Sequence, residues 1–132
     1  MENTWKYKID LRDKQMFGKI EEQMQLPFPE ELKAFVQAHN AATPAHYNFM
    51  VGVSERVFGA VLSFNAVEED ADTVSTALKA VQTAELIPFA IDPFGNYICY
   101  NSTNSHVVFW DHETSKYQDT EKKFNEFLST LY

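Results

Sequence analysis

The chain has 132 residues, the usual size of one domain, so we expect a single domain over residues 1–132. Its hydrophobic share of 45% and charged share of 23% are near the averages of globular proteins, which argues against a disordered chain and against a membrane protein. Nineteen acidic against eleven basic residues give a net charge of -8, so nucleic acid and anionic membranes would repel the chain, and a basic protein is the expected partner.

The chain carries a single cysteine, Cys99, so it can form neither an internal disulfide nor a cysteine-based zinc cluster. Its first residues lack the basic and apolar regions of a secretory signal. The longest apolar run, residues 57–62, is far shorter than the roughly 20 residues that span a bilayer. We therefore expect a cytoplasmic protein.

Two short helices joined by a proline corner are predicted near the start of the chain. The first follows Asp13, a candidate capping residue, and ends near Gln25. Its apolar residues share one face: Phe17, Ile20 and Met24. Pro27 breaks this helix, and Pro29 suits the first turn of the next one. The second helix has one buried stripe: Leu32, Phe35, Val36 and His39.

The middle of the chain has weaker patterns. Thr43-Pro44 indicates a loop and residues 47–51 a possible strand. Residues 57–64 form an apolar run that predicts a strand buried on both faces, with a short helix as the alternative. A third helix is predicted from apolar residues at a spacing of three and four: Val67, Ala71, Val74, Leu78 and Val81. Its start carries acids that the helix dipole favours: Glu68, Glu69, Asp70 and Asp72.

Residues 86–113 are predicted to form a three-stranded meander, with strands at 87–91, 97–100 and 106–110. In the first turn Pro93 fixes φ and Gly95 can take a positive φ. A terminal helix is predicted with Asp119 or Thr120 as its cap and with one apolar stripe: Phe124, Phe127, Leu128 and Leu131.

Strands grouped in this way favour an α+β fold with a mainly antiparallel sheet. Two N-terminal helices, one middle helix and one C-terminal helix are expected to pack on that sheet. Trp110 and Phe127 are expected in the core, because each lies on an apolar stripe of its element.

Motifs for catalysis and cofactor binding are not found in the sequence. The four glycines fit neither a GxGxxG nor a Walker spacing. Cys99 lies within a predicted strand and is expected to be a buried small residue, not a nucleophile. Asp111, His112 and Glu113 would alternate between the faces of a strand and could converge on one ion only if the chain turns there. His39 is expected to be a core or interface histidine. We expect no enzyme, no metal and no other cofactor.

The negative charge is concentrated in the middle of the chain. Residues 57–115 contain eight acidic residues and one basic residue, Lys79, which leaves a net charge of -7. This segment is either a solvated surface or an electrostatic docking face for a cationic protein. Both interpretations stay open on charge alone.

Several stretches occur in an order and spacing that match a known family. They are Ile20-Glu21 with residues 28–36, residues 86–100 with their aspartate, glycine and asparagine at the turn, residues 107–113, and residues 124–128. Together they resemble the Smi/Knr-like branch of the SUKH superfamily over nearly the whole chain from about Phe17 onward. The chain departs from that family at Asn40-Ala41-Ala42, where Asn-Gly-Gly is common.

The resemblance implies an α+β fold and, in bacteria, an immunity protein that binds and neutralises a toxin, often a nuclease. Eukaryotic relatives regulate cell-wall synthesis through protein contacts. We therefore expect an immunity protein that covers the basic active-site face of a cognate polymorphic toxin, a nuclease, and the alternative is a non-catalytic regulatory interaction module. An enzyme or ligand-binding domain would instead need a deep pocket with convergent polar groups. The expected partner-binding residues are Glu68, Glu69, Asp70, Asp72, Asp92, Phe94, Asn96, Asp111, His112 and Glu113.

Overall fold

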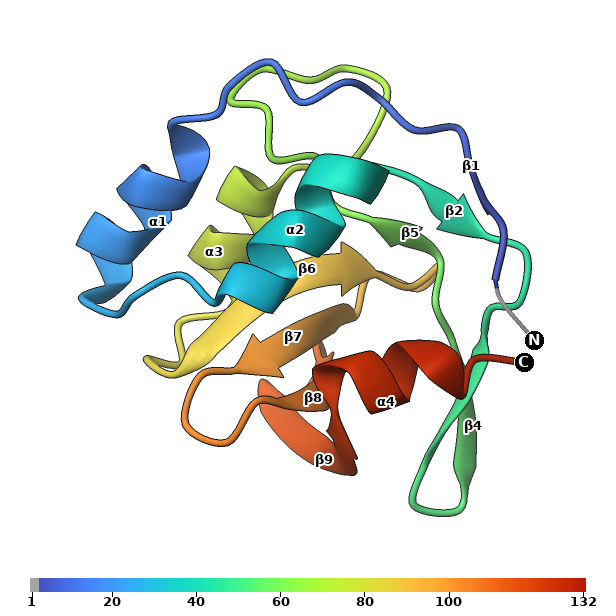
Figure 1. The fold of residues 1–132 in the computed structure, drawn as a ribbon. Helices are drawn as coiled ribbons and strands as arrows, with labels where there is room; N and C mark the ends of the chain where they lie inside the picture. The colour runs from blue at the N-terminus through green and yellow to red at the C-terminus, as the bar shows by residue number, and fades with distance from the viewer. Residues whose placement is uncertain (1–2) are drawn as a thin grey trace.

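The computed structural model describes residues 3–132, and residues 1–2 of the expected domain lie outside the described part. Its centre is a five-stranded antiparallel sheet in the order β5-β6-β7-β8-β9 (Figure 1). The strands are β5 (Ala60–Val61), β6 (Leu86–Ile91), β7 (Tyr97–Asn101), β8 (His106–Asp111) and β9 (Lys116–Lys123). The predicted meander corresponds to β6, β7 and β8 and is confirmed.

Residues 3–132 also contain four helices: α1 (Met16–Met24), α2 (Glu30–His39), α3 (Val74–Ala80) and α4 (Phe124–Ser129). Two antiparallel pairs of strands complete the fold: β1 (Trp5–Lys6) with β2 (Thr43–Pro44), and β3 (Asn48–Val51) with β4 (Ser54–Val57). The predicted α+β class is therefore confirmed. Among residues 3–132 no helix has both the length and the apolar character that crossing a membrane requires.

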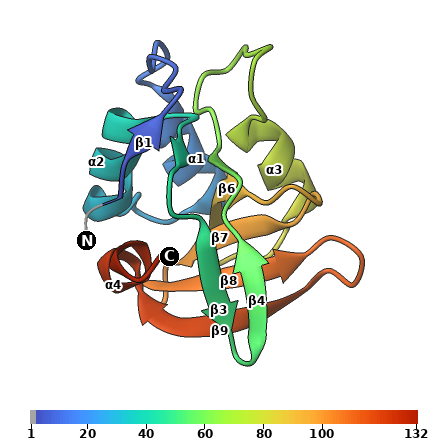
Figure 2. The same cartoon turned by 90° about the vertical axis from the view of Figure 1, so that its right-hand side faces the viewer.

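Helices cover both faces of the large sheet. Figure 2 shows α2 and α4 on one side of it and α3 on the other. Phe89 of β6 packs against the rings of Phe35 and Phe124, with centroid distances of 6.3 and 5.4 Å, and these two rings also pack on each other at 5.4 Å, so α2 and α4 share one aromatic layer. Trp110 and Phe127 are 4% and 1% exposed, which confirms both as core residues.

The two N-terminal helices and their proline corner are confirmed. Pro29 stands immediately before the first residue of α2. The Glu21 carboxylate accepts the N–H of Phe28 at 2.8 Å and so ties the corner to α1. Asp13 is not the capping residue itself: its Oδ1 accepts the N–H of Gln15, which occupies the cap position.

The third helix is shorter than predicted. It begins at Val74, where the Thr73 hydroxyl accepts the N–H of Thr76. Residues 65–72 form a loop because the backbone of Ser63 pairs with the chain on either side of Thr73, at 2.8 and 2.9 Å. This strand-like pairing holds the backbone around Thr73 extended, so α3 cannot continue toward residues 65–72. The acids at 68–72 therefore lie in a loop, not in the first turn of a helix.

Three other predictions were wrong in part. Asp119 and Thr120 do not cap the terminal helix, since both lie in β9 and α4 begins at Phe124. Thr43-Pro44 forms β2 instead of a loop. The run 57–64 is not one strand, because the chain leaves the β3–β4 hairpin after Val57 and joins the large sheet as β5. Residues 47–51 were predicted as a strand, and β3 confirms this.

Candidate functional site

Two turns meet at one end of the meander and bring together most of the predicted partner-binding residues. Tyr97 at the start of β7 pairs with Trp110 near the end of β8, so the β6–β7 turn lies beside the β8–β9 turn. Both turns lie on the side of the molecule away from α2 and α4 (Figure 2). We define the turn pair as residues 92–96 and 111–115.

The buried carboxylate of Asp92 holds the first turn together by accepting three hydrogen bonds. Its Oδ1 accepts the N–H groups of Phe94 and Asn96, at 2.9 and 2.8 Å, and its Oδ2 accepts the Asn96 side-chain nitrogen at 2.9 Å. Gly95 takes a φ of 87°, which confirms the predicted positive φ. Asp92 and Asn96 are only 6% and 8% exposed, so they form the buried base of the turn instead of a surface that a partner can reach.

Asn96 joins the two turns. Its Oδ1 accepts the backbone N–H of His112 at 3.0 Å and lies 2.7 Å from Nδ1 of the same residue. The imidazole itself is on an exposed residue. The chain does turn at 111–113, yet among residues 3–132 no group of three or more histidine, cysteine, aspartate or glutamate side chains is arranged to hold a metal ion.

The outer surface of the turn pair combines an aromatic ring with charged groups. Phe94 is 73% exposed at the tip of the first turn. Glu113 is exposed, and its N–H donates to Oδ1 of the half-buried Asp111 at 2.8 Å. The outer surface of the turn pair therefore presents Phe94, His112 and the two carboxylates, over a base in which Asp92 and Asn96 fix the backbone.

The four acids of the loop before α3 differ in their surroundings. Glu68 is turned inward, with its side chain 5% exposed and Arg12 Nη2 at 3.7 Å. Its carboxylate accepts Asn65 Nδ2 at 3.1 Å and the Ser63 hydroxyl at 3.0 Å. The hydrogen bonds from Asn65 and Ser63 hold the pKa of Glu68 below its ordinary value. Glu68 thus fixes the loop, and its buried side chain fits neither the solvated surface nor the docking face considered for this segment.

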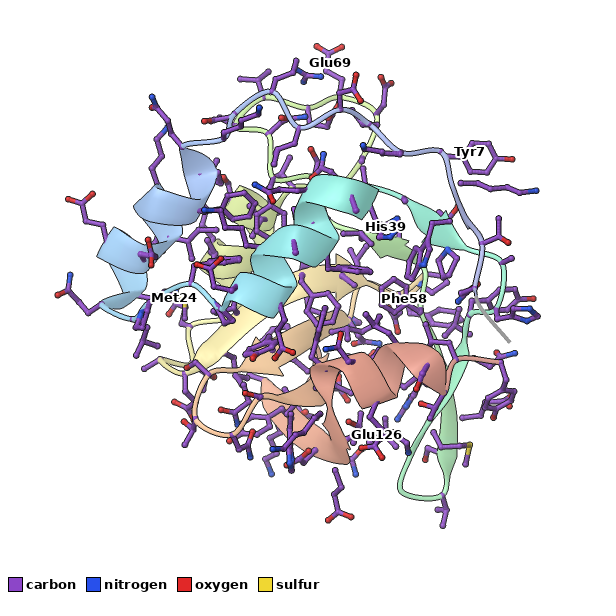
Figure 3. All side chains as sticks on the ribbon, viewed as in Figure 1. Tyr7, Met24, His39, Phe58, Glu69 and Glu126 are labelled. Carbon is purple, nitrogen blue, oxygen red and sulfur yellow. The ribbon has the colours of Figure 1, made fainter. Side chains whose placement is uncertain are left out.

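Exposed side chains carry the other three charges of this loop. Glu69 points outward from the loop in Figure 3, and Asp70 is exposed beside it. Burial, and then the negative charge of Asp72, raises the pKa of the phenol of Tyr97, the residue after the first turn. The charge at the end of the acidic loop therefore acts on the strand that follows this turn.

A groove next to the turn pair was missed by sequence reasoning. The guanidinium of Arg56 in β4 lies 4.6 Å from the centroid of the Phe109 ring, and its buried Nε has no hydrogen-bond partner among residues 3–132. The groove has a volume of about 290 Å³ and is also lined by Asp111, Thr114, Lys116, Tyr117 and Gln118. Its far wall is β9, a strand with no signal in the sequence, so nothing pointed to Arg56.

The thiol of Cys99 and the imidazole of His39 lie in the protein interior or at its edge. Cys99 is fully buried, and burial raises the pKa of its thiol, which confirms it as a buried small residue. His39 is half-buried, with the rings of Trp5 and Phe35 both at 5.2 Å. Burial first, and then the charge of Lys8, lowers the pKa of His39. This agrees with its predicted place in the core.

Comparison with known families gives one finding: the model of the SMI1 / KNR4 family (SUKH-1) matches residues 13–130. No curated protein matches the chain. The matched range includes the loop at residues 65–72 and both turns of the turn pair.

Proposed function

The chain belongs to the SMI1 / KNR4 family (SUKH-1), and on that premise we propose that it is an immunity protein, which binds a cognate nuclease toxin and covers the basic face of its active site. The observation that carries the proposal is the turn pair, which presents the exposed ring of Phe94 together with the exposed Glu113 and the half-buried Asp111 on a fixed base. The proposal includes a non-catalytic mode of action, because covering an active site needs no chemistry.

The chemistry of the turn pair suits a partner that binds phosphate. An active site that holds a nucleic-acid backbone is lined with lysine and arginine, which pair with carboxylates as they pair with phosphates. Asp111 and Glu113 offer such carboxylates, and Phe94 offers an apolar anchor of the kind that dominates binding energy at interfaces. The net charge of -8 favours the encounter with a basic protein over a longer range.

The buried base of the turn pair also favours tight binding. Ordering a loop on binding costs free energy, and a surface that is already ordered avoids this cost. Before any partner arrives, two hydrogen bonds to the Asp92 carboxylate hold the backbone of Phe94 and Asn96, and a third holds the Asn96 side chain. Phe94 is therefore presented from a fixed main chain.

Co-expression with the product of the neighbouring gene tests the proposal directly. We expect a stable complex and rescue of growth from that product's toxicity. A complex without any toxicity to neutralise would instead favour the regulatory interaction module. The absence of a complex with the neighbouring product would contradict the proposal.

Association kinetics test the electrostatic part. Glu69→Gln, Asp70→Asn and Asp72→Asn together remove three exposed charges from the acidic loop. One charge pair about 10 Å apart in water contributes about 0.4 kcal/mol, so three should slow association about eightfold at low salt and about twofold at 0.15 M. The matched control removes three exposed acids from helices α1, α2 and α4: Glu22→Gln, Glu30→Gln and Glu126→Gln (Figure 3 labels Glu126). An equal slowing in both variants would show that only net charge matters.

A further inference from the structure

His112 lies in the second turn, and a single side chain of the first turn, that of Asn96, holds its imidazole. Asn96 Oδ1 lies 2.7 Å from His112 Nδ1 and 3.0 Å from the backbone nitrogen of His112. On the other side, the Asn96 side-chain nitrogen lies 2.9 Å from Asp92 Oδ2. The orientation of this amide decides which ring nitrogen of His112 carries the hydrogen.

The partners of Asn96 fix that orientation. The backbone N–H of His112 can only donate, so the Asn96 atom that faces it must be the oxygen. The ionised carboxylate of Asp92 can only accept, so the atom that faces it must be the nitrogen. An amide oxygen has no hydrogen to give, and therefore Nδ1 of His112 must donate to it. The neutral ring is thus the Nδ1–H tautomer, and its lone pair is on Nε2.

We infer that Nε2 of His112 accepts a hydrogen bond from a lysine or arginine side chain of the protein partner. Nε2 is hydrogen-bonded to no residue within 3–132, on a residue that is exposed. The inference rests on the proposed function, which supplies the basic partner. Glu113 favours a cationic donor by charge, and the face of the exposed Phe94 ring attracts cations at the neighbouring turn. Asp92 and Asn96 are then positioning residues.

This role makes binding depend on pH. A proton on Nε2 turns the acceptor into a donor and adds a positive charge that faces the cationic partner. The charged groups on the adjoining segments are Asp92, which binds Asn96 from the first turn, Asp111 and Glu113 on either side of His112 in the chain, and Lys116, which pairs with Asp111 at the start of β9. Between pH 8 and about 5.5 the Kd should rise by at most tenfold per pH unit, the limit for one proton.

The tautomer can be measured on the protein without a partner. Long-range ¹H–¹⁵N correlation spectra at pH 8 distinguish the protonated ring nitrogen from the one with the lone pair. We expect His112 to show a protonated Nδ1 and an unprotonated Nε2. A spectrum of the Nε2–H tautomer would overturn the inference whatever the partner does.

Two substitutions test the acceptor role in the complex. His112→Asn places an amide nitrogen near the position of Nδ1, so it can still donate to Asn96 Oδ1, but it has no group at Nε2. His112→Gln reaches the position of Nε2 with an amide oxygen that does not titrate. At pH 8 we expect His112→Asn to raise the Kd about tenfold and His112→Gln to raise it less. Both variants should lose the pH dependence.

The outcomes separate this inference from the proposed function. If the complex forms and His112→Asn binds as tightly as the wild type at pH 8, the acceptor role is refuted and the proposed function stands. If the neighbour-encoded protein forms no complex at all, the proposed function and the acceptor role fail together. Unfolding midpoints of both variants, measured alongside, show whether a change in Kd merely reflects a damaged fold.

Discussion

Replacing Asp92 with alanine should destabilise the protein by about 3–5 kcal/mol. The carboxylate is 6% exposed and accepts three N–H groups, two of them in bonds that are fully buried. A hydrogen bond to an ionised group contributes about 1.5–3 kcal/mol, and a buried donor left without an acceptor loses its full solvation. The two buried bonds to Asn96 would together contribute about 3–6 kcal/mol, which includes the expected cost. The N–H of Phe94 adds little, because its bond is only partly buried and water can replace the carboxylate.

The isosteric substitution Asp92→Asn removes the negative charge of the side chain but keeps its shape, so it distinguishes the contribution of charge to stability from that of packing. It retains one oxygen for the backbone N–H groups but places an amide nitrogen opposite the Asn96 side-chain nitrogen, where two donors face each other. One bond is then lost, and the expected cost is about 1.5–3 kcal/mol. Asp111→Ala is the matched control, because this aspartate accepts one exposed N–H in the neighbouring turn. Its cost should stay below about 1 kcal/mol.

Urea unfolding measures these differences, since chains under 150 residues usually unfold in two states. The midpoint should fall in the order wild type, Asp92→Asn, Asp92→Ala, with an unchanged m value. If Asp92→Ala stays within about 0.5 kcal/mol of the wild type, or if Asp111→Ala costs as much, then the buried carboxylate does not hold the turn and the reasoning fails.

Three further changes test the core, the turn and the loop. Phe127→Ala should cost about 3–5 kcal/mol in urea unfolding, because its ring is 1% exposed and packs on Phe49 at 5.1 Å; a cost under 0.5 kcal/mol would contradict this. Gly95→Val should cost at least about 1–2 kcal/mol in the same assay, since a φ of 87° strains a branched residue, and an unchanged midpoint would refute it. The stability that Glu68 adds, relative to Glu68→Gln, is present above its ordinary unfolded pKa and is lost as pH falls through its lower folded pKa. The urea midpoints of the wild type and of Glu68→Gln should therefore converge as the pH falls, and a constant difference between them from pH 7 to 3 would contradict this role of Glu68.

The parts of the fold that the sequence predicted have strong local signals. The meander follows from turn residues such as Pro93 and Gly95 between apolar strands, and the turn forms where its chemistry requires. Helix α2 follows from a single apolar stripe after Pro29. In both cases burial and local propensity favour the same structure, so tertiary contacts do not oppose the local preference.

Two of the failures, at the start of the third helix and at β9, involve polar side chains that bond to a distant part of the main chain. The spacing of Val67 and Ala71 fits a helix, but Asn65 Oδ1 accepts backbone N–H groups of Arg12 and Asp13 and holds the loop to a distant segment. Strand β9 shows no alternation, because its residues are exposed on both faces except near Thr120, whose hydroxyl donates to the Val107 carbonyl. Neither long-range bond is visible in a periodic pattern.

The candidate site residues fall into two groups that the sequence did not distinguish: side chains on the surface and side chains that hold the backbone from inside. Phe94 and Glu113 are exposed where a partner can reach them, whereas Asp92 and Asn96 are buried and act on the backbone. Whether a carboxylate is solvated depends on which donors the fold brings to it, as the opposite surroundings of Glu68 and Glu69 show. Composition and charge counts cannot separate these two cases.

The arrangement of the exposed groups assigns different steps of binding to different parts of the proposed surface. Loop acids such as Glu69 and Asp70 extend from the molecule and act over a Debye length, so they influence how often a basic partner arrives. Phe94 and His112 can act only on contact, from a turn that Asp92 already holds in place, so in the proposed complex they should influence how long the partner stays bound. The loop variant should therefore change the association rate and its salt dependence with little effect on dissociation, whereas His112→Asn should speed dissociation at every salt concentration. If the effects of both variants appeared in the same rate constant, the loop and the turn pair would form one contact surface, and the two would not have separate roles in binding.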